Sequence, residues 1–481
     1  MTDATSSNAS LSNAIGRAVR IPIFKLFLIA ILIPALMVPM AFVSGLIGAR
    51  ESRADGVRME VASLWGSSQL IAGPILVVPY SVLRVTTVAD KRVEEVQERR
   101  AVFLPETLSV TGEAKSQVLH RSIFDVPVYN SELAFEGRFL APRMSDVAVQ
   151  THEIRWREAV LVVAINDVSG LKATANVLIN GSDAVPFDPS LGLPATNLNG
   201  VHVKLIDATS LGLAADPAAP IPAFGFRFDL RLNGSGALDV APVARETSVA
   251  LSADWPHPSF GGVFLPTERS VRKDGFSARW YVPHLARSVP QAWNLHEGGI
   301  ERIRAYGFGT RFYTPVDFYK LISRASKYAV MFLSAAFMAV FLLEFRSARQ
   351  VHPVQYGFVG FTMVFFFVLL LSFAEHIGFV KAYVLAATAT GGLLALYVGR
   401  VQQSLAKGAA TLVLFLVLYG LLYLILGMED YALLAGAILG FALLATIMFA
   451  TLKVDWSGGL ARAAGPPSPT APAPVGPAPA E

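Results

Sequence analysis

Segments long and apolar enough to cross a bilayer lie near both ends of this 481-residue chain, and they constrain its fold more than any other feature. A membrane-spanning helix needs about 20 mostly apolar residues at a rise of about 1.5 Å each. One such segment lies near the N-terminus and five are clustered near the C-terminus. The six segments are residues 26–48, 328–343, 356–373, 382–398, 410–426 and 431–452. They predict an integral membrane protein with six transmembrane α-helices in the lipid bilayer.

The first apolar segment, residues 26–48, follows a basic start that is also typical of signal peptides. The apolar core of a signal peptide is usually about 7 to 15 residues long. Because this segment is longer, we interpret it as an uncleaved signal anchor. Pro34 and Pro39 inside it each remove a backbone donor and predict a kink.

Basic residues in the short loops predict the orientation of the six helices. Lys and Arg within about 15 to 20 residues of a helix end are retained in the cytoplasm. They precede the first helix and recur in every second loop, as Arg17, Arg20, Lys25, Arg346, Arg349, Arg400, Lys407, Lys453 and Arg462. This alternation places both termini in the cytoplasm and the segment between the first two helices on the opposite side.

The chain therefore divides into five predicted parts. Residues 1–25 form a cytoplasmic tail, residues 26–48 the first helix, residues 49–327 an extracytoplasmic domain and residues 328–452 a five-helix transmembrane bundle. Residues 453–481 are rich in proline and alanine, a composition that cannot bury enough apolar surface to fold. We expect this last part to be a disordered cytoplasmic tail.

The charges of the chain are divided unevenly between these parts. Residues 49–326 contain 29 basic and 29 acidic residues, so the rest of the chain carries the whole net charge of +4. A nucleic-acid-binding protein would cluster Lys and Arg on one domain, and we therefore expect no nucleic-acid partner. The chain contains no cysteine, which excludes disulfides and Cys-ligated metal sites.

Alternating apolar and polar residues in the large middle segment predict β-strands. Residues 224–232 read Phe-Gly-Phe-Arg-Phe-Asp-Leu-Arg-Leu, and residues 171–179 alternate in a similar way. This period of two is typical of half-buried strands, so we expect an all-β, sandwich-like domain after a short helical stalk at residues 50–70. A weak internal match between Phe103-Leu104-Pro105 and Phe264-Leu265-Pro266 suggests a duplicated β unit.

Enzyme motifs are absent from the sequence. It contains no G-x-S-x-G elbow and no phosphate-binding G-x-x-x-x-G-K-[ST] loop, and His152-Glu153 and His296-Glu297 both lack the second His of H-E-x-x-H. We therefore expect a protein that is not an enzyme and that holds no cofactor or metal.

A few polar residues lie in or near the predicted membrane helices. A charge in the hydrocarbon costs at least about 2.5 kcal/mol, so such residues are functional candidates. Glu344 lies at the cytoplasmic end of the second helix, where Arg346 and Arg349 favour an interfacial side chain. Glu375 and His376 lie at the outer end of the third helix, and a loop position there is an equally good interpretation.

One aromatic and proline-rich stretch of the middle segment is also distinctive. It reads Trp255-Pro256-His257-Pro258-Ser259-Phe260. Its prolines favour a rigid, extended backbone. Trp255, His257 and Phe260 could contact a ligand or partner, or they could close the edge of the sandwich. A less favoured hypothesis pairs His257 with Asp254 for catalysis on a lipid or glycan.

Several short motifs, in this order and spacing, resemble the CreD family of cell envelope integrity inner-membrane proteins. They are Arg53-Ala54-Asp55, Gly73-Pro74, Asp254-Trp255-Pro256-His257-Pro258-Ser259-Phe260, Phe264-Leu265-Pro266, Arg324-Ala325-Ser326-Lys327-Tyr328-Ala329, Phe337-Met338-Ala339, His352-Pro353-Val354-Gln355-Tyr356 and Glu375-His376-Ile377-Gly378-Phe379. The resemblance covers about residues 20 to 456. It implies a Gram-negative inner-membrane protein linked to envelope stress, to a two-component system acting on its gene, and to resistance against cell-wall-active or pore-forming agents.

The resemblance implies no established enzyme activity and no catalytic residues. With the residue patterns, it predicts a non-enzymatic protein that maintains cell envelope integrity or responds to envelope stress. Its periplasmic β domain would bind an envelope protein or a cell-wall component. The alternative is a proton-coupled transporter or channel, in which the five-helix bundle carries substrate and Glu344, Glu375 and His376 relay protons.

Overall fold

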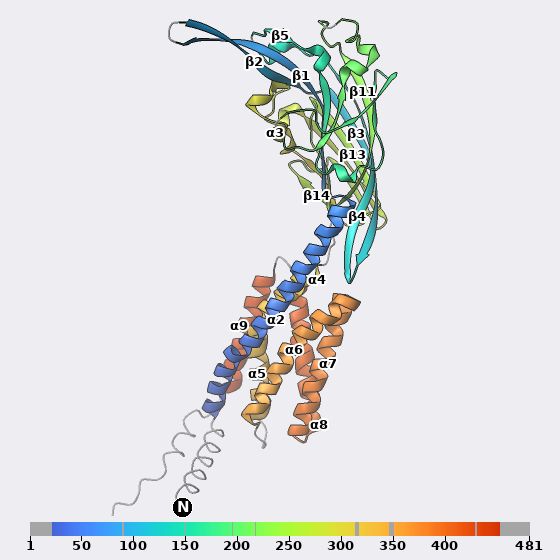
Figure 1. Cartoon of the computed structure of the whole chain (residues 1–481). Helices are drawn as coiled ribbons and strands as arrows, with labels where there is room; N and C mark the ends of the chain where they lie inside the picture. The colour runs from blue at the N-terminus through green and yellow to red at the C-terminus, as the bar shows by residue number, and fades with distance from the viewer. Residues whose placement is uncertain are drawn as a thin grey trace, which may run out of the picture. The chain divides into compact units, whose positions relative to one another are not determined.

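The computed structural model describes residues 22–88, 91–148, 150–194, 196–216, 218–312, 317–345, 351–428 and 431–452. Its contacts divide the chain into two compact units (Figure 1). The membrane unit comprises residues 1–52 and 316–481, and the β unit comprises residues 53–315. Most of the basic residues that predict orientation, and the Pro/Ala-rich tail, lie outside the described residues.

Each of the six predicted apolar segments is occupied by a helix. The helices are α2 (Pro22–Trp65), α5 (Ala329–Phe345), α6 (Pro353–Ile377), α7 (Phe379–Val401), α8 (Leu405–Gly427) and α9 (Ala432–Thr451), with α4 (Phe318–Lys327) directly before α5. Among the described residues, four helices are long and apolar enough to cross a membrane: α2, α6, α7 and α8. Helices α4 and α5 meet the same criterion together but are bent by 54°, and α9 contributes a shorter apolar stretch.

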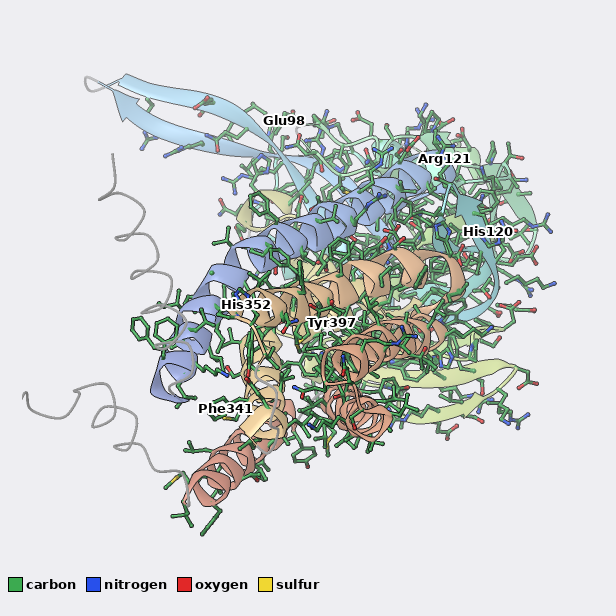
Figure 2. All side chains as sticks on the ribbon, turned by 90° about the horizontal axis from the view of Figure 1, so that it is seen from below. Glu98, His120, Arg121, Phe341, His352 and Tyr397 are labelled. Carbon is green, nitrogen blue, oxygen red and sulfur yellow. The ribbon has the colours of Figure 1, made fainter. Side chains whose placement is uncertain are left out.

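Helix α2 joins the predicted first helix and most of the predicted helical stalk in one element. It runs without interruption through Pro34 and Pro39 and absorbs most of the predicted stalk, ending at Trp65. Its last part belongs to the β unit, where Val57 and Val61 pack against two valines of β4. Arg121 at the end of β3, labelled in Figure 2, forms an ion pair with Glu60 of this part of the helix.

The boundary between α6 and its neighbours follows from local sequence. His352 caps α6 by accepting a hydrogen bond from the Val354 N–H, and the Gln355 side chain accepts one from the His352 N–H at 2.8 Å. Pro353 at the first helical position needs no donor there. At the other end Gly378 has a φ of 77°, a conformation that glycine adopts without strain, and α7 begins at the next residue.

The β unit contains two sheets. The first, of 10 strands, has the order β14-β18-β12-β1-β6-β10-β9, with β2, β5 and β17 pairing off this path, and the second has the order β15-β16-β13-β3-β4-β11-β7-β8. The strands are β1 (Gln69–Val88), β2 (Lys91–Phe103), β3 (Thr107–Arg121), β4 (Phe124–Phe139), β5 (Glu153–Ile154), β6 (Val160–Ile165), β7 (Asn176–Ile179), β8 (Asp183–Pro186), β9 (Asp188–Pro189), β10 (Gly200–Lys204), β11 (Phe224–Ser235), β12 (Ala237–Val240), β13 (Glu246–Ala253), β14 (Pro258–Gly262), β15 (Glu268–Arg272), β16 (Gly275–Pro283), β17 (Ala292–Asn294) and β18 (Phe308–Phe312).

Aromatic side chains from both sheets meet in one core. Tyr129 of β4 stacks on Phe312 of β18 with ring centroids 4.6 Å apart, and its hydroxyl donates to the Ala237 carbonyl of β12 at 2.6 Å. Trp280 of β16 lies 5.7 Å from Phe308 of β18. The prediction of a large β-rich domain is confirmed.

The two predicted strands differ in outcome. Residues 224–232 form β11 with the expected alternation of buried and exposed side chains. In the segment 171–179 the strand begins only at Asn176, and Leu171 makes just an isolated bridge with Leu232. The prediction over residues 171–175 is wrong because alternation alone does not distinguish a strand from a short extended connection.

One strand pattern occurs twice in the β unit. Strands β1, β3, β4 and β6 lie in the first, second, second and first sheet, and β12, β13, β16 and β18 repeat this order. Within each set the outer two strands pair antiparallel, as do the inner two. The two sets join through parallel pairs, β1 with β12 and β3 with β13.

This repeated topology supports a duplicated β unit, but the sequence match that suggested it involves the wrong segments. Pro105 precedes β3, whereas Pro266 precedes β15. The counterpart of β3 in the pairing is β13, not β15.

Candidate functional site

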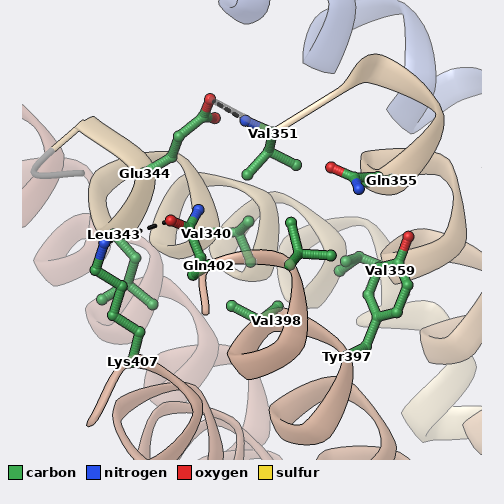
Figure 3. A pocket seen from close by; sticks show the side chains of 11 residues that line it. Val340, Leu343, Glu344, Val351, Gln355, Val359, Tyr397, Val398, Gln402 and Lys407 are labelled. Atoms are coloured by element: carbon green, nitrogen blue, oxygen red, sulfur yellow. Dashed lines mark hydrogen bonds between the residues drawn. The ribbon is translucent and has the colours of Figure 1, made fainter. Parts of the chain in front are cut away.

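Glu344, near the end of α5, is the centre of a buried polar cluster. Glu344 is only 5% exposed. It forms an ion pair with Lys25 of α2, which is 6% exposed. The Tyr356 hydroxyl donates to Glu344 Oε2 at 2.7 Å. The Val351 N–H donates to Glu344 Oε1 at 2.6 Å, the bond marked in Figure 3. We refer to Lys25, Glu344 and Tyr356 as the inner cluster.

The interpretation of Glu344 as an interfacial side chain beside Arg346 and Arg349 is therefore corrected. The carboxylate is buried and its cation comes from Lys25, while the two arginines lie outside the described residues. Burying a charge is unfavourable unless it is paired and hydrogen-bonded. Three donors around one carboxylate meet that requirement.

A small cavity adjoins the inner cluster (Figure 3). Its volume of about 20 Å³ gives room for about one water molecule. Polar groups reach it from Glu344, Gln355, Tyr397, Gln402 and Lys407, and the rest of its wall is aliphatic. The cavity can hold a water beside a charged pair, but it is too small for an organic substrate.

Glu375, in the last turn of α6, has a cluster of its own. Its side chain is 8% exposed, accepts a hydrogen bond from the Tyr319 hydroxyl at 3.1 Å and lies 3.8 Å from Arg50 Nε of α2. We refer to Arg50, Tyr319 and Glu375 as the outer cluster. The neighbouring His376 is also helical, but its side chain is exposed.

The structure does not bring the candidate membrane residues Glu344, Glu375 and His376 together. Tyr356, which contacts Glu344, and Glu375 are both on α6, 19 residues or about 28 Å apart along the helix. What the two clusters share is α2, because Lys25 and Arg50 are both on that helix. The clusters therefore attach α2 to α5 and α6 at two separated levels.

The aromatic stretch of the β unit leads into β14, the strand at one end of the first sheet. The Trp255 indole donates to the His257 carbonyl at 3.1 Å and lies edge-on to Phe312, with ring centroids 6.3 Å apart. Phe260 packs edge-on against Phe276 at 5.5 Å. The two outer aromatic residues thus fix the loop, and the His257 side chain is exposed.

Asp254 has a different partner from the one that the catalytic hypothesis requires. Its carboxylate accepts a hydrogen bond from the Ser116 N–H of β3 at 2.6 Å. Among the described residues, no hydrogen bond joins Asp254 to His257. No group of three or more potential metal ligands occurs in the described part of the chain either.

Asp239 of β12 is a titratable residue that the sequence reasoning missed. Burial raises the pKa of its carboxyl to about 6, against the opposing effect of the Arg311 charge. Across the strand pair lies Gly309, where a Cβ would come within 2.7 Å of Asp239 Oδ1. The sequence does contain a signal for Asp239, because it is a charged residue inside the short apolar run Ala237-Leu238-Asp239-Val240.

Comparison with known proteins places the chain in a family. The family described as "Inner membrane protein CreD" matches residues 22–457 of the chain. The chain belongs to the CreD family. Inner membrane protein CreD of Escherichia coli (strain K12) is 30% identical to it over 428 residues, which cover 88% of this chain and 90% of that protein. Family membership and the apolar helices together support a multi-pass location in the inner membrane.

The residues that carried the CreD resemblance acquire structural roles. His352 and Gln355 cap α6, and the next residue, Tyr356, holds Glu344. Glu375 is the acid of the outer cluster, and Gly378 separates α6 from α7. In this CreD-family chain both motifs of α6 therefore serve the contacts of that helix with its neighbours.

Proposed function

We propose that this CreD-family protein maintains the integrity of the cell envelope, or responds to envelope stress, without catalysing a reaction. In this proposal six helices span the inner membrane, both termini are cytoplasmic and residues 49–327 are periplasmic. The β domain binds a protein of the envelope. A cell-wall component is the other partner consistent with the family's link to the envelope.

The observation that carries the proposal is the union of apolar helices with a large β unit in a chain that the CreD family model matches over residues 22–457. One helix of 44 residues holds two ion pairs in the membrane unit and continues into the β unit. There Val57 and Val61 are part of a buried apolar cluster, and Glu60 pairs with Arg121. The same chain therefore supplies both apolar membrane helices and a separate β domain that can bind a partner.

The edge of the first sheet is the favoured contact surface. Strand β14 pairs with β18 and lies at the end of the strand order, so one of its sides has no partner among the described strands. An unpaired edge can accept an extended peptide as an additional strand. Beside it His257, Val263 and Leu265 are exposed, the last two by 53% and 70%.

Site-specific crosslinking in living cells tests this proposal. A photoreactive amino acid at position 257 or 265 should capture a discrete envelope protein, whereas the same group at the exposed Ser252 on β13 should not. We also expect His257→Ala to weaken the capture from position 265 without lowering the amount of protein in the membrane.

Two outcomes would contradict the proposal. Absence of adducts at both positions in well-expressed protein would show that the edge is not the binding surface. Turnover of lipid or glycan by the purified protein would contradict the non-enzymatic role.

The inner cluster and its water-sized cavity support a second candidate, a proton-coupled transporter or channel. A buried carboxylate beside a water is a common element of proton pathways. The separation of about 28 Å between the levels of the two acids argues against a direct relay. If this candidate is right, proteoliposomes that contain the unsubstituted protein should show proton flux, and those that contain the Glu344→Gln/Glu375→Gln double variant should lose it. Equal, near-zero flux in the unsubstituted protein and in the double variant would eliminate the candidate.

A further inference from the structure

A groove between the end of α7 and the start of α8 has no role in the function proposed above. Its volume is about 380 Å³. Its walls are mostly small or aliphatic, with Leu396 and Leu405 at its margin exposed by 70% and 93%. The two helices approach closely nearby, since a Cβ on Gly399 would lie 3.2 Å from the Cα of Gly408.

One charged residue, Arg400, is among the described lining residues of this groove. Arg400 is in the last turn of α7, its side chain is exposed, and no ion pair is recorded for it among the described residues. The remaining polar lining residues are Gln403 and Ser404, which carry no charge. Within the described part of the chain, the groove therefore combines an apolar wall with one cation that has no recorded ion pair, at the end of a membrane helix.

The backbone at the start of α8 adds donors to the same end of the groove. Ser404 occupies the cap position but its side chain makes no capping hydrogen bond, and the first backbone bond of α8 runs from the Gly408 N–H to the Ser404 carbonyl. The first N–H groups of a helix otherwise lack intrahelical acceptors. They suit the oxygen atoms of a phosphate group.

We propose that this groove binds an anionic phospholipid. An acyl chain lies against Leu396, Ala409 and Leu412, and the headgroup phosphate accepts hydrogen bonds from the Arg400 guanidinium and from the first N–H groups of α8. A guanidinium matches the geometry of phosphate oxygens well. A lipid is the occupant that fits, because hydrocarbon surrounds apolar helices of this length and the groove joins an apolar wall to a cation at a helix end.

Lipid binding to the full-length protein in detergent micelles tests the proposal by native mass spectrometry. Phosphatidylglycerol should bind more tightly than phosphatidylcholine with the same acyl chains. Arg400→Gln should weaken the apparent affinity for phosphatidylglycerol about tenfold, which corresponds to about 1.4 kcal/mol. Lys381→Gln, which removes an exposed cation near the other end of α7, is the matched control and should leave the affinity unchanged.

Two further variants keep the test decisive. Arg400→Lys retains the charge and should recover part of the preference, and Ala409→Phe fills the groove and should reduce the binding of both lipids. Equal affinities for the two lipids, or equal losses in the Arg400→Gln and Lys381→Gln proteins, would overturn the proposal. A dimer that Ala409→Phe dissociates would assign the groove to a second copy of the chain, and lipid binding that appears only after removal of residues 457–481 would assign it to the tail.

Discussion

Lys25 and Glu344 depend on each other because both are buried. Removing one member of a buried ion pair leaves an uncompensated charge and costs about 3–5 kcal/mol. We therefore expect Lys25→Met to lower the melting temperature of the detergent-solubilised protein strongly, and the Lys25→Met/Glu344→Gln double variant to recover part of the loss. Lys320→Met, at a side chain that is 64% exposed, should have little effect. A double variant that is less stable than Lys25→Met alone would contradict this coupling.

Asp239 makes stability depend on pH. Its carboxyl keeps a proton up to about pH 6 in the folded protein, whereas the ordinary pKa is 3.8. Because the folded state binds more protons in this window, the free energy of unfolding falls as the pH rises from about 4 to 6. Asp239→Asn should remove this decline, measured as melting temperature against pH in the full-length protein.

Asp183 is a suitable comparison for Asp239. Its carboxylate accepts hydrogen bonds from Ser210 and Thr209, which hold its pKa below the ordinary value. Its contribution is therefore lost as the pH falls, the opposite direction. If Asp183→Asn and Asp239→Asn changed the pH profile in the same direction, the assignment to Asp239 would be wrong.

For single residues, the sequence identifies some functional candidates but not the residues that they contact. Glu344 was selected because acids are rare in apolar segments, yet Lys25 is 319 positions away, and no local pattern connects them. Trp255 and Phe260 were selected as an aromatic pair, but which rings they contact depends on the packing of two sheets. Burial of Asp239 likewise follows from strands that are distant in the sequence.

The start of α6 shows how much one cap contributes to a helix. Loss of an N-terminal cap costs about 0.5–2 kcal/mol, so His352→Ala should lower the melting temperature measurably. His376→Ala changes an exposed histidine in the last turn of the same helix and should not. The labelled His352 in Figure 2 marks the capped end. Equal effects of the two substitutions would show that the cap is unimportant.

Apolar length predicts well where the helices of the membrane unit lie, because a helix that faces lipid must be apolar whatever its tertiary contacts are. It does not predict where a helix stops once the apolar run is over. The extension of α2 to Trp65 depends on Val57 and Val61 packing against β4. The start of α4 at Phe318 likewise depends on a cap, since the Asp317 side chain accepts a hydrogen bond from the Tyr319 N–H at 3.2 Å.

The orientation of the whole protein can be tested because the chain contains no cysteine. A single cysteine introduced as Ser259→Cys, at an exposed position of β14, should react with a membrane-impermeant maleimide in cells whose outer membrane alone is permeabilised. Gln403→Cys, in the loop between α7 and α8, should react only after the inner membrane is opened. The reverse pattern would invert the proposed topology.

The repeated strand pattern has a consequence for the order in which the β domain is completed. Strands β1 and β3 belong to the first set, but each pairs in parallel with a strand, β12 or β13, that follows more than 130 residues later. Pairings between distant segments form slowly. The first half of the domain must therefore remain incomplete, with open strand edges, until residues 237–253 are available for pairing, and those edges are exposed to aggregation in the meantime.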